Sequence, residues 1–364
     1  MSLPATDASR RADALVLSSR PKRNEVDPFR PNGVFLEWER SRFGRPELTL
    51  TALLTNRECP YRCVYCDLWK NTTEFRVPPG AIPAQIDLAL QHARTTLPPE
   101  PPVPVWDAAT DLAASPDARS PDARSPDAGS PAAPRLPRHI KLYNAGNFFD
   151  AQAIPPEDYR PIIERVQDFD TVIVENHPRL CGVVVPDFAR ALGTQLEVAL
   201  GLETIHPEIL PRLNKRMTLD DFRGAVDLLT GHDILVRAFV LLRPPYLPSG
   251  EAGDEQGIEW AIKSVEYAFD AGVGVCAIIP MRSGNGYMEK LAKQGEFEPP
   301  SLTALERAFE GALALRGGRV FADLWDIERL RGCPACATAR KARMARMNLT
   351  QETEPAVSCQ ACGA

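Results

Sequence analysis

The sequence lacks any apolar run that approaches the roughly 18–20 residues a helix needs to span a bilayer. Its N-terminal stretch also lacks the apolar core of a signal peptide, because the run at 14–17 is too short. The formal net charge of −6 disfavours a protein that coats itself with nucleic acid, although a local basic patch remains compatible with it. We therefore expect no membrane partner and a cytoplasmic location. In that reducing compartment the nine cysteines are better explained as metal ligands than as disulfides.

Size and composition set broad bounds. A chain of 364 residues can hold two average domains or one α/β barrel-like domain with additions. Its 44% hydrophobic and 25% charged residues are ordinary for a soluble globular protein.

Three cysteines follow an apolar stretch at 47–54, in the spacing C-x3-C-x2-C: Cys59, Cys63 and Cys66. Thiolates are the soft ligands that iron–sulfur clusters require, and three of them can hold one corner of a cubane cluster. The fourth iron would then be open to a group that is not protein. The alternatives are a zinc site or three unrelated buried cysteines, but zinc knuckles usually pair one C-x2-C with another, and this loop has no fourth cysteine close by.

The spacing, with Tyr65 just before the third cysteine, resembles the cluster loop of the radical S-adenosylmethionine (SAM) superfamily. The resemblance implies a 4Fe-4S cluster on the three cysteines and SAM on the open iron. It also implies reductive cleavage of SAM to methionine and a 5′-deoxyadenosyl radical, with an electron donor such as a reductase, a flavodoxin or a ferredoxin. Tyr65 would lie near the adenine; the alternative is a core aromatic.

Strand-like and helix-like segments alternate along the chain. Strands are predicted at 47–54, 139–143, 171–175, 196–201, 234–242 and 273–279, and helices at 83–97, 158–167, 186–192, 219–229 and 257–271. This alternation predicts a parallel sheet with right-handed crossovers. Six units are too few for a closed eight-fold barrel, and they match the partial (β/α)6 barrel of radical SAM enzymes. Further segments are a strand at 34–39, a helix at 301–315 and a possible edge strand at 319–325.

Two stretches show no sustained period. Residues 1–30 are rich in Arg, Asp, Ser and Pro and are predicted to be a mobile tail. Residues 98–137 contain a repeated Ser-Pro-Asp-Ala-Arg unit that can form neither helix nor strand, so we predict a disordered insertion. The predicted organisation is an N-terminal tail and possible strand at 1–45, a barrel at 46–325 and a small metal-binding module at 326–364.

Polar residues follow several strands at the edge where parallel sheets place their chemistry. Glu175 follows the third strand, where an acidic residue can bind both ribose hydroxyls. His177 could act as a base or be a hydrogen-bonded structural histidine. By resemblance, a turn after the second strand would bind the SAM ammonium through its backbone, or it is a plain connection; it comprises Asn144, Ala145, Gly146 and Asn147.

The resemblance also assigns residues after the later strands. Glu203 would contact the ribose or the methionyl end of SAM, and Lys215 or Arg216 would hold its carboxylate. Arginine suits a carboxylate better because its guanidinium binds two oxygens at once; the alternative is a solvated basic turn. Arg282 lies in a glycine-containing segment that is either a substrate or adenine loop or a flexible connector.

A second cysteine set forms two C-x2-C hooks near the C-terminus: Cys333, Cys336, Cys359 and Cys362. Four thiolates suit tetrahedral zinc, and an auxiliary Fe-S cluster is the alternative. Between the hooks, residues 340–346 form a basic helical stretch that would either guide a phosphate backbone or face solvent. Cys181 and Cys276 have no partners in sequence and are predicted to be buried small hydrophobes.

Within the superfamily, the chain looks most like the branch of the Elongator catalytic subunit and the archaeosine-synthase partner. The similarity lies at 148–150, Glu175, 201–203 and 214–218. That branch implies a tRNA nucleoside as substrate. Two alternatives remain: a radical SAM enzyme with an auxiliary cluster that acts on a peptide or small metabolite, and a non-enzymatic zinc/Fe-S binding protein.

Overall fold

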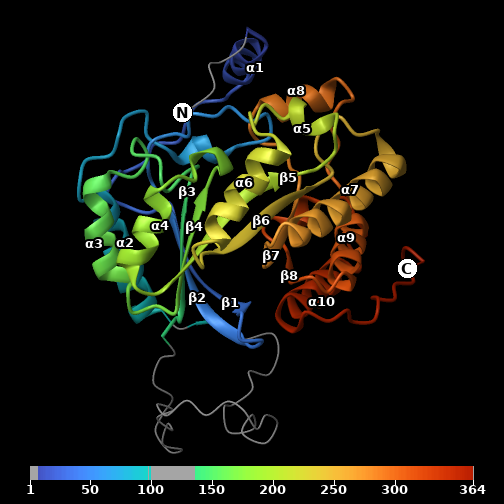
Figure 1. Cartoon of the computed structure of the whole chain (residues 1–364). Helices are drawn as coiled ribbons and strands as arrows, with labels where there is room; N and C mark the ends of the chain where they lie inside the picture. The colour runs from blue at the N-terminus through green and yellow to red at the C-terminus, as the bar shows by residue number, and fades with distance from the viewer. Residues whose placement is uncertain (1–6, 97, 100–135, 364) are drawn as a thin grey trace, which may run out of the picture.

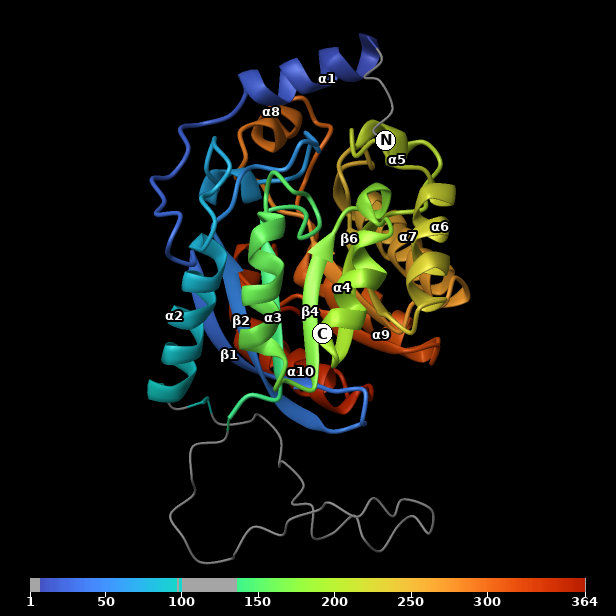
Figure 2. The same ribbon diagram turned by 60° about the vertical axis from the view of Figure 1, so that its left-hand side comes forward.

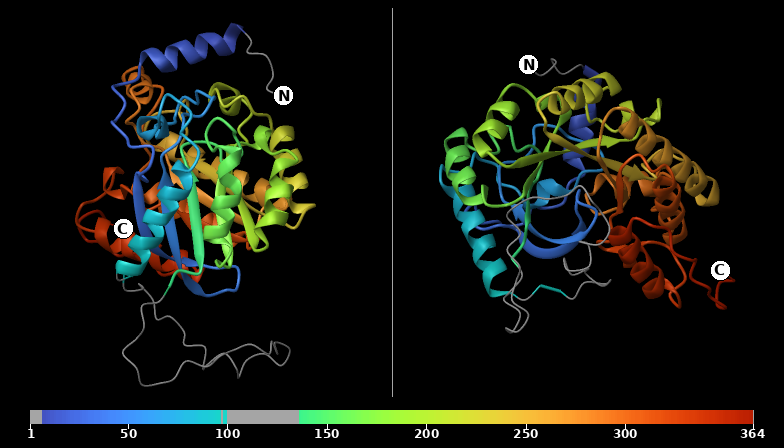
Figure 3. Two further views of the ribbon diagram at one scale, coloured as in Figure 1. Left: turned by 90° about the vertical axis from the view of Figure 1, so that its left-hand side faces the viewer. Right: turned by 60° about the horizontal axis from the view of Figure 1, so that its bottom comes forward.

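A single curled sheet with helices on its outer face forms the body of the protein (Figures 1 and 3). The computed structural model describes residues 7–96, 98–99 and 136–363. Nearly all of the predicted insertion at 98–137 therefore lies outside the described residues. In the described part, no helix is both long enough and apolar enough to cross a membrane.

The sheet has eight strands that follow one another in chain order. β1 is antiparallel to β2, and every later neighbour is parallel. The strands are β1 (Gly33–Arg40), β2 (Pro46–Leu54), β3 (His139–Asn144), β4 (Thr171–Asn176), β5 (Gln195–Glu203), β6 (Leu235–Leu242), β7 (Val275–Pro280) and β8 (Arg319–Ala322). The predicted partial α/β barrel is confirmed, and the possible edge strand is β8.

Helices cover the outside of the curl. They are α2 (Ala81–Thr95), α3 (Tyr159–Val166), α4 (Val184–Leu192), α6 (Leu219–Thr230), α7 (Gly250–Asp270) and α9 (Leu302–Ala314). The strand residues that face them are apolar, for example Leu50, Ile140 and Val172, all fully buried. A parallel sheet covered in this way requires such apolar strands, which is why the strand predictions held.

Charged side chains fill the inside of the curl near its lower end. Arg237 donates from Nε to Glu197 at 2.6 Å, and it also pairs with Glu39 of β1. Lys141 is the second cation beside Glu39. Burial alone would raise the pKa of Glu39, but these two cations hold it well below its usual range. These charged side chains fill the barrel interior away from the carboxyl ends of the strands. The site lies at those carboxyl ends.

The N-terminal prediction needs correction. Instead of a tail without regular structure, Asp7–Ser18 form a helix, α1, that crosses above the carboxyl ends of the strands beside α8 (Tyr287–Lys293) (Figure 2). Among the side chains of this helix that the structure describes, Val16 alone belongs to a buried apolar cluster, at 2% exposure. A single buried position produces no hydrophobic period, so periodicity does not predict the helix.

The C-terminal helix α10 (Ala337–Thr350) packs against β1, β8 and α9. Its Met344 and Met347 are fully buried in the main core. The Asn348 amide pairs with both backbone groups of Ala322, at 2.9 and 3.0 Å. The helix therefore ties the two edges of the open barrel together.

Candidate functional site

The cysteine loop directly follows β2 at the carboxyl end of the barrel. Segments from distant parts of the chain fix it. Val64 donates its N–H to Leu213 at 3.0 Å, and the Asn285 amide donates to the carbonyls of Val64 and Cys66 at 2.8 and 3.1 Å. Asn285 was not among the predicted residues, because an asparagine in a loop carries no signal until its partner is known.

The three cysteines of the loop are partly buried neighbours. Burial, and the charges of neighbouring thiols, raise the pKa of Cys59, Cys63 and Cys66 to about 12 in each case. Thiols in this state are neutral and need a metal centre to become ligands. The donor set thus fits the three protein-held corners of a 4Fe-4S cluster.

The predicted turn after β3 packs against this loop. A Cβ on Gly146 would lie 2.6 Å from Cβ of Cys59, and its φ of 138° also favours glycine. Asn147 donates from Nδ2 to Sγ of Cys59 at 3.2 Å, and its Oδ1 accepts from the His177 N–H at 2.8 Å. Asn147 therefore links the cysteine loop to the end of β4.

The other two residues of the turn, Ala145 and Asn144, also lie next to the cysteine loop. Ala145 donates its N–H to Asn56 at 3.2 Å. Asn144 is 2% exposed, and neither polar atom of its amide has a hydrogen-bond partner among the described residues. A buried amide without partners is unusual in a native fold and is compatible with a missing polar ligand nearby.

Glu175 lies at the end of β4 among buried groups. Burial raises the pKa of its carboxyl to about 8, against the opposing effects of the Asn144 backbone N–H and of Lys215. A carboxyl in such a place can accept hydrogen bonds from vicinal hydroxyls, as ribose-binding acids do.

Glu203 and Lys215, predicted as separate SAM contacts, form a buried ion pair with side chains 6% and 7% exposed. Glu203 adopts a φ of 69° where the register of β5 shifts. A Cβ on Gly201 would lie 1.9 Å from Oε1 of Glu203 and 2.2 Å from Nζ of Lys215. Glycine at 201 thus makes room for the pair.

Arg216 points elsewhere, since its guanidinium pairs with Asp13 of α1. Burial lowers the pKa of the Lys215 amine, but the Glu203 carboxylate raises it more, and Cys63 and Cys59 lie close enough to add to that rise when they are thiolates. The two candidates for the SAM carboxylate therefore face different surroundings, and Lys215 is the one beside the cysteine loop.

Two aromatic rings belong to the loop. Tyr65 is partly buried, and desolvation together with the Glu203 carboxylate raises the pKa of its hydroxyl well above the usual value. Tyr61 stacks on His177, with ring centroids 3.9 Å apart and planes 12° from parallel.

His177 has both ring nitrogens engaged. Nδ1 accepts from the Arg179 N–H at 3.2 Å, so Nε2 carries the proton and donates to the Lys215 carbonyl at 3.1 Å. Burial and the nearby Lys215 lower its pKa to about 2. These contacts favour the structural histidine over the base.

Arg282 follows β7 and pairs with Asp323 at 2.8 Å. Its Nε is buried without a partner. The Arg282–Asp323 ion pair shares no residue with the Glu203–Lys215 pair. A role of Arg282 in binding adenine or substrate therefore stays a prediction.

The C-terminal cysteines form a second centre. The sulfurs of Cys333, Cys336, Cys359 and Cys362 all lie within 4.8 Å of one another. Four thiolates at about 2.3 Å from a tetrahedral zinc would be about 3.8 Å apart, and Cys336 and Cys362 are 3.9 Å apart. Backbone N–H groups of Cys362 and Ala361 lower the pKa of the Cys359 thiol to about 7, which suits a thiolate ligand.

The basic stretch between the hooks does not match either reading made from the sequence, because its main arginines are buried. Arg340 and Arg343 pair with Glu306 of α9 at 2.7 and 3.3 Å. Arg346 pairs with Glu354 at 2.7 Å. The charges of Arg340 and Arg343 are used inside the fold and are not available to a phosphate backbone, whereas the Arg346 side chain is 39% exposed.

The two remaining cysteines differ in burial. Cys276 is fully buried in the main core, as predicted. Cys181 is partly buried at the edge of that core and accepts from the Asn176 amide at 3.4 Å.

No protein-family model matches the chain. Two curated relatives match parts of it. An uncharacterised protein of Methanocaldococcus jannaschii is 23% identical over 172 residues, which is 46% of each chain. The archaeosine synthase subunit beta of Methanosarcina acetivorans is 26% identical over 179 residues, which is 46% of this chain and 48% of that protein. The matched part is about half the length of each relative.

Solved structures with a related chain trace include Elp3 of Methanocaldococcus infernus, at 18% identity and a TM-score of 0.42, over 58% of this chain and 55% of that one. Another is the radical SAM methyltransferase TsrM of Kitasatospora setae, at 14% identity and a TM-score of 0.41, over 67% of this chain and 36% of that one. The match to an archaeosine synthase subunit confirms the resemblance to that branch predicted from the sequence.

Proposed function

We propose that this chain is a radical SAM enzyme that modifies a tRNA nucleoside. The radical SAM assignment rests on one observation: Cys59, Cys63 and Cys66 lie in one loop at the carboxyl end of a parallel partial barrel. These cysteines would hold a 4Fe-4S cluster, and that cluster, once reduced by one electron from an external donor, would supply the electron for reductive cleavage of SAM.

Four residues around the loop support the proposal of a SAM site. Gly146 brings backbone next to Cys59, where the methionyl ammonium would bind. Glu175 would accept the ribose hydroxyls, and Lys215 would attract the carboxylate while remaining paired with Glu203. Tyr65 would lie against the adenine.

A tRNA substrate is supported by the curated relative, which is named as a subunit of archaeosine synthase. The alternative of an auxiliary-cluster enzyme is less well supported, because the second cysteine set has the close sulfur spacing of a single tetrahedral ion. We accordingly propose zinc at that centre. The electron donor would be a reductase, a flavodoxin or a ferredoxin.

The test is 5′-deoxyadenosine formation by anaerobically reconstituted protein, with and without total tRNA from cells that lack the gene. We expect turnover to rise several-fold with this tRNA and to be unaffected by fully modified tRNA. Metal analysis should give about four irons and one zinc per chain. About eight irons without zinc, or no response to tRNA, would favour the peptide or metabolite alternative.

A further inference from the structure

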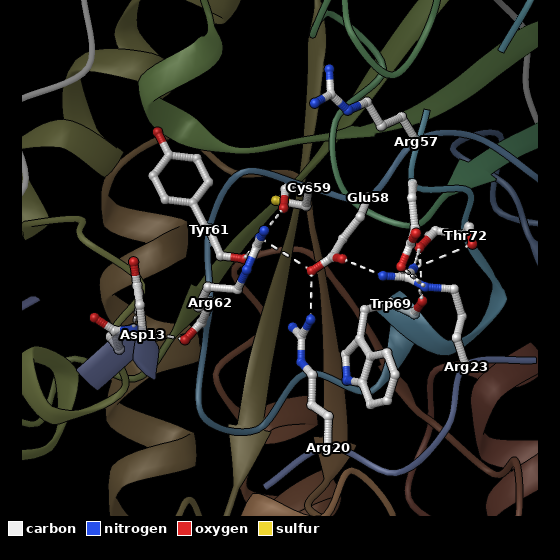
Figure 4. Close-up of polar contacts among 12 residues, drawn as sticks. Asp13, Arg20, Arg23, Arg57, Glu58, Cys59, Tyr61, Arg62, Trp69 and Thr72 are labelled. Atoms are coloured by element: carbon white, nitrogen blue, oxygen red, sulfur yellow. Dashed lines mark hydrogen bonds and ion pairs between the residues drawn. The ribbon is translucent and has the colours of Figure 1, made fainter. Parts of the chain in front are cut away.

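Glu58, immediately before Cys59, forms ion pairs with three arginines (Figure 4). Arg20 donates to its Oε1 at 2.7 Å, Arg23 to its Oε2 at 2.6 Å, and Arg62 lies 3.1 Å from Oε1. The carboxylate is 12% exposed. We refer to Glu58, Arg20, Arg23 and Arg62 as the Glu58 clamp.

The arginines of the clamp also hold the backbone on both sides of the cysteine loop. Arg23 donates to the carbonyls of Trp69 and Thr72 at 2.6 and 3.2 Å. The Arg20 guanidinium lies over the Trp69 ring, 4.5 Å from its centroid. Arg62 donates to the carbonyls of Cys59 and Tyr61 inside the loop.

The clamp joins two distant parts of the sequence. Arg20 and Arg23 belong to the segment that follows α1, whereas the loop follows β2. Asn24 extends the contact by donating its N–H to the Lys70 carbonyl at 3.0 Å. The N-terminal segment is therefore part of the wall around the loop.

The clamp also carries a charge imbalance. Three guanidinium groups and the Glu58 carboxylate leave a net charge of +2, and the arginine side chains are only 9%, 21% and 22% exposed. Glu74 lies 3.9 Å from Nε of Arg23, but its side chain is 84% exposed, so water screens its charge. Charges that are shielded from water act over longer distances than surface charges. One-electron reduction of a cluster makes it more negative by one charge, so cations held nearby favour the reduced form.

On the basis of the proposed function, we propose that the Glu58 clamp is a set of positioning residues. It fixes the cysteine loop to the N-terminal segment, and its net positive charge raises the reduction potential of the cluster bound there. None of its members is required to touch SAM or substrate.

The test is a reductive titration with dithionite and mediators, followed by electron paramagnetic resonance, in which the titrant supplies the one electron. Arg20→Gln and Arg23→Gln each remove one positive charge, and each should lower the reduced fraction at a fixed potential about tenfold, which corresponds to about 59 mV. Glu58→Gln removes the negative charge and should move the potential in the opposite direction. Lys22→Gln is the matched control, because it removes a charge from the same segment where the side chain is 89% exposed.

Opposite shifts for the arginine and glutamate variants, with an unchanged Lys22→Gln, would support the proposal. Arg20→Lys should restore the potential by restoring the charge. The proposal would be overturned if all variants had the reduction potential of the wild type. It would also be overturned if the arginine and glutamate variants shifted the potential in the same direction. Loss of the cluster from both arginine variants, but not from Lys22→Gln, would overturn the electrostatic role and show that the Glu58 clamp is purely structural. Failure of the proposed function would instead appear in the wild type, as a protein that holds a reducible cluster but does not cleave SAM.

Discussion

Replacing Lys215 by methionine should destabilise the fold strongly, because it leaves the Glu203 carboxylate buried without its cation. The side chains are 7% and 6% exposed, so solvent offers little compensation. Removing one partner of a buried pair costs about 3–5 kcal/mol. At about 2.1 cal/mol/K per residue, the 364 residues give an unfolding entropy of roughly 0.8 kcal/mol/K, so Tm should fall by about 4–7 °C.

Differential scanning calorimetry at one scan rate, on samples with matched iron and zinc content, measures this change. The control is Lys263→Met, which breaks a pair with Glu259 on α7 whose side chains are 46% and 54% exposed. That exposed pair is worth at most about 0.5 kcal/mol, or less than about 1 °C. The double variant Lys215→Met/Glu203→Gln should recover part of the loss, since it no longer buries an unpaired charge. A Tm for Lys215→Met within 1 °C of the control would refute the reasoning.

Three further predictions follow from other parts of the site. Cys336→Ser should remove the zinc and lower Tm while leaving about four irons per chain, which metal analysis checks; loss of iron in proportion to zinc would contradict separate centres. Because the folded-state pKa of Glu175 is raised to about 8, its carboxyl lowers stability progressively as pH rises from about 4.5 to 8. Tm of the wild type should therefore fall relative to Glu175→Gln across that range, and a constant difference would argue against the raised pKa. Gly146→Ala should cost about 1–3 kcal/mol and reduce iron incorporation, because its Cβ would collide with Cys59 and its φ of 138° disfavours alanine; normal iron content with unchanged Tm would contradict the close approach.

The parts of the fold that follow from periodicity were predictable from the sequence. Strands such as β4 and β6 are apolar where helices cover the sheet, so composition and length were enough to find them. The cysteine loop was predictable because its ligand spacing is local. Gly146 and Asn147 were singled out by resemblance, and the structure places both beside Cys59.

Contacts between distant residues could not be predicted in this way. The Glu203–Lys215 pair depends on a register shift in β5, and no local sequence pattern predicts that shift. Arg340 and Arg343 look like a solvated basic face until Glu306 of α9 is brought beside them. The Glu58 clamp joins residues 35 to 38 positions apart, and polar pairs at such separations leave no periodic signal.

The most direct test of the account is the behaviour of the reduced cluster when SAM is added. We predict that electron paramagnetic resonance of the anaerobically reduced wild type changes on SAM binding and that 5′-deoxyadenosine and methionine then form in equal amounts. Cys59→Ala, Cys63→Ala and Cys66→Ala should each abolish both signals while the zinc of the second centre remains. The central claim would be contradicted if protein with a complete, reduced cluster showed no spectral change on addition of SAM and formed no 5′-deoxyadenosine.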